Sequence, residues 1–349
     1  MNRNIRRLKN IFSPMLGIAF ILAIPAYGQA QEEGVFLDPQ TGDYLIRFKS
    51  YTGLIEEGIF YPHTKIEPTV KSKSKLTDDG SIMYRYKVRS GNASKQNLVT
   101  VIIYASNAHA AGQISPSEWG GSVAPNLDGN GYIVSWSSLL SKRTKEGDKT
   151  ALQGLSPNSG MAEFGFYSAD LPGVGIMRLR GKASITMLPD EGPDPSSPVG
   201  ITYHELRQKD FVPRPAAVPL IPVPNPFDAA AVLTSMQKHV NQDMVSMKLI
   251  DPAFASQLDR LFQAAIDAAK GGNTVALKSD IKDLRQMLKR EHADVGKDDE
   301  DWDKDNNDGK NKEKDKSRLI DKLAARVLDF DLRYVAKQIT DKKGKDKED

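Results

Sequence analysis

The stretch IMYRYKVRS, residues 82–90, decides the fold of the first half of the chain. Its apolar and basic residues alternate, the apolar ones being Tyr84, Tyr86 and Val88 and the basic ones Arg85, Lys87 and Arg89. Alternate side chains of a strand point to opposite faces of a sheet. The stretch therefore predicts a strand with one buried and one water-facing side, as in an antiparallel sheet.

Similar short stretches lie on both sides of it. They are rich in Ile, Val, Tyr and Phe, are separated by turn clusters such as DDG and LDGNG, and include DYLIRFKSY, NLVTVIIYAS, GYIVSWSS and GIMRLRGKASITML. No helical period of comparable strength intervenes. Residues 34–210 are therefore predicted to form an antiparallel β-sandwich, immunoglobulin- or jelly-roll-like, with Trp119 and Trp136 as core anchors.

The stretch AEFGFYSADLPG has an aromatic cluster followed by a proline and a glycine. Phe164 and Phe166 are two residues apart, so both should point to one face and enter the core. Pro172 and Gly173 are expected to turn the chain into the next strand. The alternative makes Phe166 and Tyr167 an exposed aromatic platform for a sugar or a peptide.

Residues 211–227 contain the proline-rich run VPRPAAVPLIPVPNP. Proline fixes φ and donates no backbone hydrogen bond, so the run should be extended and semi-rigid. It is predicted to be a linker between two domains. The alternative is an edge strand on the sandwich, because AVPLIPV is apolar enough to pack.

After this run the apolar period becomes helical, which predicts a small antiparallel helical bundle over residues 228–341. The expected caps are Asp228, Asp251 and Asn273 or Thr274, and the last helix should begin near Ser317. The charged insertion 294–317 and the tail 342–349 are predicted to be disordered, because they have little apolar surface to bury.

Residues 1–30 combine basic residues, the apolar run MLGIAFILAI and small residues before Ala30. This order is typical of a secretory signal peptide, and the run is about half the length of a membrane span of roughly 20 residues. The chain has no cysteine, which excludes disulfides, thiolate metal sites and a lipidated cysteine. A secreted or periplasmic protein is predicted, without membrane insertion after signal cleavage.

Removing residues 1–30 takes away four of the 48 basic residues and none of the 45 acidic ones, so the expected mature chain is close to neutral. Nucleic-acid binders usually carry an excess of positive charge. The composition therefore predicts no nucleic-acid partner.

The acidic insertion contains the one metal candidate of the sequence. Asp301, Asp303 and Asp305 have the alternate spacing by which a calcium loop presents its oxygen ligands, which suggests weak calcium binding. Asn306 and Lys312 stand where such a loop has glycine and glutamate, so a solvated acidic loop is the other interpretation. No other cofactor is indicated.

Candidate catalytic groups are scattered. None of the five histidines stands in a metal-binding motif, and His204 and Glu205 would point to opposite faces of a strand. The carboxylates that remain for a hydrolase are Glu118, Asp128, Glu163 and Asp170. Three hypotheses follow: a non-enzymatic exported protein that binds an envelope or extracellular glycan or protein, an envelope hydrolase acting on glycan or ester substrates with a carboxylate-based site in the sandwich, and a structural matrix or surface-layer component.

Residues 82–181 resemble a sandwich module of exported bacterial proteins. The matching features are a Tyr-x-Tyr-x-Val strand, a Ser-x-Gln turn, a Pro-x-x-Trp turn, a Val-x-Trp strand and a Gly-Phe-x-Ser segment with Leu-Pro-Gly, carried here by Tyr84, Tyr86, Val88, Ser94, Gln96, Trp119, Trp136, Gly165, Phe166, Ser168 and residues 171–173. This resemblance implies a fold and no activity.

The C-terminal helical part is similar to FIMAH-type helical appendages of exported bacterial proteins. The similarity lies in LIDPAFASQLDRLFQAAIDAAKGGNTVALKSDIKDLRQML and in the closing SRLIDKLAARVLDFDLRYVAKQI. Leu284 and Met287 replace the name-giving Phe-Ile-x-x-His segment, and the acidic insertion is unusual for the family. The resemblance implies an accessory module.

Overall fold

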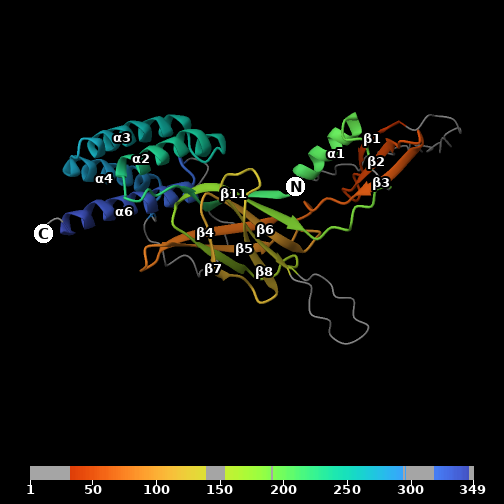
Figure 1. Ribbon diagram of the computed structural model, residues 1–349, viewed down its shortest axis with the longest axis horizontal. Coiled ribbons are helices and arrows are strands. Elements are labelled where there is room, and N and C mark those ends of the chain that lie inside the picture. The colour runs from red at the N-terminus through yellow and green to blue at the C-terminus, as the bar shows by residue number, and fades with distance from the viewer. Residues whose placement is uncertain (1–31, 139–153, 190–191, 294, 296–317, 346–349) are drawn as a thin grey trace, which may run out of the picture.

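The computed structural model describes residues 32–138, 154–189, 192–293, 295 and 318–345 (Figure 1). The expected signal peptide, almost all of the charged insertion and the last four residues lie outside these ranges. The described residues form a mixed β and α structure with three antiparallel sheets and five α-helices. None of these helices has the length and apolar character needed to span a membrane.

Two of the sheets contain most of the strands. The four-stranded sheet has the order β4(Pro68–Leu76), β5(Ile82–Ser90), β10(Ala162–Ser168), β7(His109–Ile114). The five-stranded sheet has the order β12(Val212–Ile221), β11(Leu171–Gly181), β6(Leu98–Ala105), β9(Tyr132–Ser138), β8(Trp119–Pro125). All strand pairs within them are antiparallel, as the alternation predicted.

Aromatic side chains fill the space between these two sheets. The ring of Trp136 on β9 lies 5.6 Å from that of Phe164 and 6.1 Å from that of Phe166, both on β10. Trp119 on β8 lies 4.9 Å from Phe164. Both phenylalanines and Trp136 have no exposed surface. The prediction of core anchors is confirmed, and the alternative of an exposed platform at Phe166 is wrong.

The proline-rich segment is a strand rather than a linker over residues 212–221. β12 pairs with β11 at the edge of the five-stranded sheet. The Ala217 N–H points away from β11 and donates to Ser72 Oγ of β4 at 2.8 Å. Residues 213, 215 and 219 are prolines, each an even number of residues from Ala217. Their backbone nitrogens therefore also point away from β11, where the sheet requires no N–H donor. The linker prediction is therefore wrong here, and the edge-strand alternative is right.

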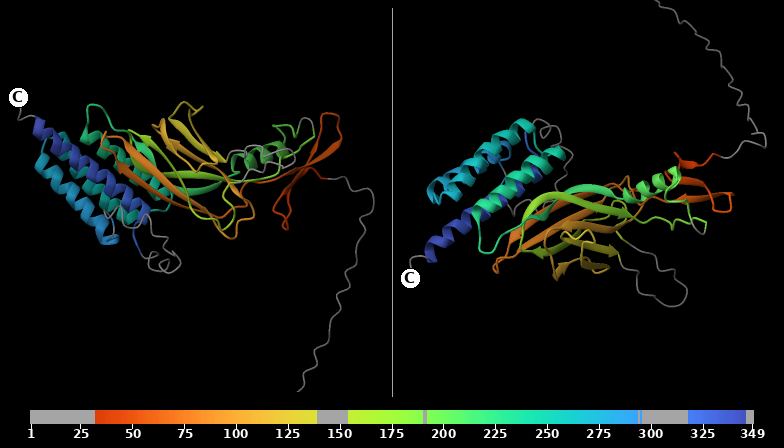
Figure 2. Two further views of the ribbon diagram at one scale, coloured as in Figure 1. Left: turned by 90° about the horizontal axis from the view of Figure 1, so that it is seen from below. Right: turned by 45° about the horizontal axis from the view of Figure 1, so that its top comes forward.

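The first strands form a small sheet of their own. β1(Gly34–Leu37), β2(Tyr44–Lys49) and β3(Ile55–Phe60) pair in this order, and α1(Pro198–Gln208) covers one face of their sheet. This unit lies at the end of the molecule opposite the C-terminal helices (Figures 1 and 2). The predictions that these strands belong to the sandwich and that His204 lies on a strand are both wrong.

Residues 198–208 are helical because local and tertiary signals agree. Ser197 caps the helix by accepting a hydrogen bond from Gly200 N, and Pro198 occupies the first turn. Val199, Tyr203 and Leu206 are spaced by three or four residues and pack against Phe60 and the other buried residues of the small sheet.

Four helices follow β12. They are α2(Ala229–His239), α3(Pro252–Lys270), α4(Thr274–Glu291) and α6(Lys322–Lys345), and a π-helical turn at Val240–Met244 extends α2. Asp228, Asp251 and Asn273 accept hydrogen bonds from the first turns of α2, α3 and α4, which confirms the predicted caps. α2 packs on α3, α3 on α4, and α4 on α6.

These helices share one apolar core with the two facing sheets. His239 of α2 lies at the junction, where its Nε2 accepts a hydrogen bond of 2.9 Å from Val174 N of β11. Gly173 makes room for the imidazole, because a Cβ there would come within 2.9 Å of Nε2. Pro172 and Gly173 lie inside β11. The prediction of a turn at these two residues is wrong, because the chain turns before Leu171.

Candidate anion-binding site

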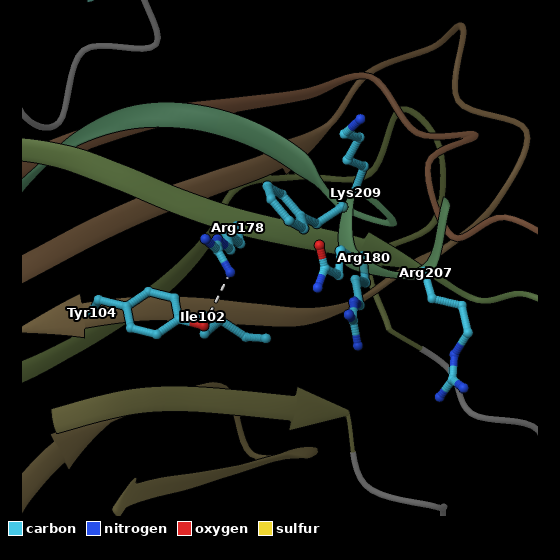
Figure 3. Close-up of a pocket in the computed structure, with 8 residues that line it drawn as sticks. Ile102, Tyr104, Arg178, Arg180, Arg207 and Lys209 are labelled. Carbon is cyan, nitrogen blue, oxygen red and sulfur yellow. Dashed lines mark hydrogen bonds between the residues drawn. The ribbon is translucent and has the colours of Figure 1, made fainter. Parts of the chain in front are cut away.

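A pocket of about 510 Å³ lies on the outer face of the five-stranded sheet (Figure 3). It is lined by Ile102 and Tyr104 of β6, Arg178 and Arg180 of β11, Arg207 and Gln208 of α1, and the following Lys209 and Phe211. Four of the eight lining residues are cations, and none is acidic. The pocket therefore presents a positive field to any ligand that enters it.

Strand alternation places the arginines in the pocket. Met177 and Leu179 are completely buried between the two facing sheets. Arg178 and Arg180 alternate with them and so point to the outer face. Ile102 of β6 is the direct antiparallel partner of Arg178. The end of α1 and the connection to β12 then bring Arg207, Lys209 and Phe211 over the same sheet.

Arg178 is the central cation of the pocket. Its guanidinium carbon lies 4.6 Å from the ring centre of Tyr104 and 4.3 Å from that of Phe211. Its Nη1 donates a hydrogen bond of 3.0 Å to Tyr104 Oη, the dashed line of Figure 3. Its Nε is buried without an acceptor. Since no carboxylate among the described residues pairs with it, the guanidinium keeps its capacity to bind an anion.

The contacts of the other three cations compensate little of the positive charge of the pocket. Arg180 Nε donates to the Asp210 carbonyl oxygen at 3.0 Å, and Arg207 lies 5.8 Å above the ring of Tyr203. Lys209 pairs with Glu205 at 3.3 Å, but both side chains are largely exposed, and such pairs contribute little.

His63 and Asp210 hold the rim of the pocket in place. Both oxygens of the buried Asp210 carboxylate are engaged by His63, Oδ1 by its backbone N–H at 2.6 Å and Oδ2 by its Nδ1 at 2.5 Å. Asp210 stands between Lys209 and Phe211, so this pair fixes the position of both lining residues.

The carboxylates considered for a hydrolase are not assembled into a site. Asp170 is buried and accepts hydrogen bonds from Ser106 Oγ at 2.7 Å and from Val223 N. Glu163 pairs with Arg85 on the outer face of the four-stranded sheet. Glu118 and Asp128 are exposed in separate connections.

Metal sites are equally absent from the part of the chain that the structure describes, where no three His, Asp or Glu side chains are grouped to hold an ion. The calcium candidates Asp301, Asp303 and Asp305 lie outside the described residues.

The arginines of the pocket were not among the functional residues predicted from the sequence. A signal was present, because two arginines at alternate positions of GIMRLRG must share a face. Whether this face is the one that α1 approaches depends on the tertiary structure. The sequence matches no protein-family model and no curated protein, so the geometry of the pocket is the basis for a functional assignment.

Proposed function

We propose that this chain is a non-enzymatic binding protein of the cell envelope or the extracellular space, and that its pocket holds an anionic group of a glycan ligand. The observation that supports this most directly is Arg178. A partly buried guanidinium without a carboxylate partner gains hydrogen bonds and charge compensation when an anion binds. The signal-like residues 1–30 support export.

The architecture fits a binding role. The two facing sheets correspond to a β-sandwich of the immunoglobulin or jelly-roll type, which presents sheet faces and loops to a ligand. The C-terminal helices correspond to a helical bundle of FIMAH type, with the role of a spacer or docking piece. In support of this arrangement, the helices share one apolar core with the two facing sheets.

A hydrolase is the less supported function. Among the residues that line the pocket there is no carboxylate, and Asp210 beside it is engaged by His63. The lining also contains no serine or threonine that would serve as a nucleophile. Aromatic rings and guanidinium groups are instead suited to holding an acidic sugar, with the rings packing against carbon and the cations binding the charge.

Calorimetry with short oligogalacturonides tests this proposal. Arg178→Gln removes the charge and should weaken binding about tenfold or more, because hydrogen bonds to charged groups contribute roughly 1.5–3 kcal/mol. Arg290→Gln is the matched control, since Arg290 is exposed on α4, a helix that contributes no residue to the pocket. Equal affinities of wild type and Arg178→Gln, with both proteins folded, would refute the assignment of the pocket.

A further inference from the structure

The small sheet of β1, β2 and β3 has one covered and one open face. α1 packs on the covered face, where Ile46, Phe48 and Phe60 are buried. In Figure 1, α1 lies on the side of this sheet that is nearer to the middle of the molecule. Strand alternation directs the residues between the buried ones to the other side. We refer to that side as the open face.

A row of apolar side chains crosses the open face. Phe36 of β1 is the direct partner of Leu45 of β2, and Leu45 is the direct partner of Ile59 of β3. Ile59 in turn forms a bridge with Met187, which adds the connection after β11 to the edge of the sheet. Phe36 and Ile59 are 41% and 42% exposed, and Met187 is 78% exposed. We call these four residues the apolar row.

The apolar row is contiguous. Directly opposed side chains of neighbouring strands lie about 5 Å apart, so four of them in register extend over roughly 15–20 Å. Ile185, two residues before Met187, is 85% exposed and adds apolar surface at this edge of the sheet. Monomeric proteins rarely expose contiguous apolar patches larger than a few hundred Å², and such patches often mark an interaction site. The row is therefore a candidate contact surface.

An ion pair lies beside the apolar row on the same face. Arg47 of β2 and Glu57 of β3 are direct partners, and Arg47 Nε donates to Glu57 Oε1 at 2.6 Å. The Arg47 guanidinium carbon also lies 5.5 Å from the ring centre of Phe36. Both charged side chains are partly exposed. The open face thus combines an apolar row with charges of both signs.

These charges decide which partner fits the open face. A symmetric contact brings a surface patch against the same patch of a second copy, so each charge must find its opposite within that patch. Arg47 and Glu57 meet this condition, because the arginine of one copy can approach the glutamate of the other. A lipid surface offers the glutamate no such partner, and insertion would remove both charges from water. A second copy of this chain is therefore the best match.

We propose that the open faces of two copies pack against each other and form a symmetric dimer. Two sheets packed face to face lie about 10 Å apart and interdigitate their side chains. Four strands of about six residues cover roughly 400 Å² of sheet in each copy, so the dimer buries on the order of 1,000 Å² of accessible surface. This area is at the lower end for specific complexes, and the dimer should form at micromolar concentrations.

The dimer leaves both pockets accessible. α1 packs on the side of the small sheet opposite to the open face, and its end contributes Arg207 and Gln208 to the pocket. The eight lining residues of the pocket include none from the small sheet. A dimer therefore has two pockets, and a ligand long enough to reach both gains affinity. This gain rests on the proposed function of the pocket, whereas the dimer itself does not.

Sedimentation equilibrium of the chain from residue 31 on, at about 1–100 μM, measures the association. Ile59→Thr/Met187→Gln replaces two members of the apolar row by polar residues, and threonine is suited to a strand. Leu127→Gln/Val275→Thr is the matched control, because these two residues are 99% and 76% exposed and lie outside the small sheet. The melting temperature of each variant shows whether it is folded.

Two charge reversals test the symmetric contact itself. Arg47→Glu leaves two negative charges at this place on the open face, and Glu57→Arg leaves two positive charges. Each variant alone should therefore associate more weakly than wild type. Mixed in equal amounts, the two variants should associate again, because each supplies the charge that the other lacks. A role of the ion pair within one copy predicts no such recovery.

The mass of wild type should shift from that of one chain to that of two over this concentration range. The apolar-row variant should associate about tenfold more weakly or less, because its facing side chains no longer bury apolar surface. The matched control and Arg178→Gln should associate as wild type does. Phosphatidylglycerol vesicles serve as the competing partner.

Several results would overturn the proposal. Wild type that stays monomeric, an apolar-row variant that still dimerises, or an equal loss in the matched control would each do so. So would a failure of the two mixed charge variants to associate. A mass beyond two chains would contradict a contact that closes on itself. Vesicle binding by wild type that the apolar-row variant abolishes would assign the open face to a membrane instead.

Discussion

Phe166→Ala tests whether the aromatic cluster of β10 holds the two facing sheets together. The Phe166 side chain is completely buried, and its ring lies 5.4 Å from Tyr84, 6.2 Å from Tyr86 and 6.1 Å from Trp136. Truncation removes contacts to both sheets and leaves a cavity. Substitutions of this kind cost about 3–5 kcal/mol. At roughly 2–4 °C for each kcal/mol, the melting temperature should fall by about 6–20 °C.

Urea denaturation followed by tryptophan fluorescence is a suitable assay, because Trp136 adjoins the cavity. Tyr167→Ala is the control, since Tyr167 is the next residue, points to the opposite face and is partly exposed. The control should lose about 1 kcal/mol or less. A loss below about 1 kcal/mol for Phe166→Ala would refute the argument that this ring belongs to the core.

Two further predictions concern the junctions of the sheets. Burial lowers the pKa of His239, and its Nε2 must be unprotonated to accept the hydrogen bond from Val174 N. The unfolded chain therefore binds a proton at His239 more readily than the folded chain does. The contribution of His239 to the free energy of unfolding should be full above about pH 6.5 and should decline as the pH falls below it. The melting temperature between pH 8 and 5 should show a smaller decline in His239→Gln than in wild type, and identical declines would contradict this role. In β12, the N–H of Ala216 faces its partner Gly175 of β11, whereas the backbone nitrogen of Pro215 points away from β11. Ala216→Pro should therefore lower the free energy of unfolding by about 3 kcal/mol or more. Pro215→Ala should be nearly neutral in the same urea titration. Equal effects of the two substitutions would show that the assignment of which backbone nitrogens of β12 face β11 is wrong.

The sequence by itself determined the features that depend on neighbouring residues. Alternation identified the strands, and the spacing of Phe164 and Phe166 predicted that both enter the core. Asp228, Asp251 and Asn273 were recognisable as caps, because a capping side chain binds N–H groups only two or three residues ahead. Such contacts are within reach of the chain before it folds.

The pocket was only partly predictable from the sequence. The alternation of GIMRLRG puts Arg178 and Arg180 on one face of a strand. The pocket combines β6, β11 and α1, which approach one another only after folding.

Tertiary structure decided the proline-rich segment, and it added to the local signals of Ser197 and Pro198 in selecting the helix α1. Prolines at alternate positions are compatible with both a linker and an edge strand, and the choice depends on whether β11 and β4 are there to pair with residues 212–221. Tyr203 and Leu206 similarly fit a strand or a helix until the small sheet offers them a surface to cover. The physical reason is the same in both cases. Backbone preference differs little between the competing conformations, and burial against a partner distant in the sequence contributes the larger free energy.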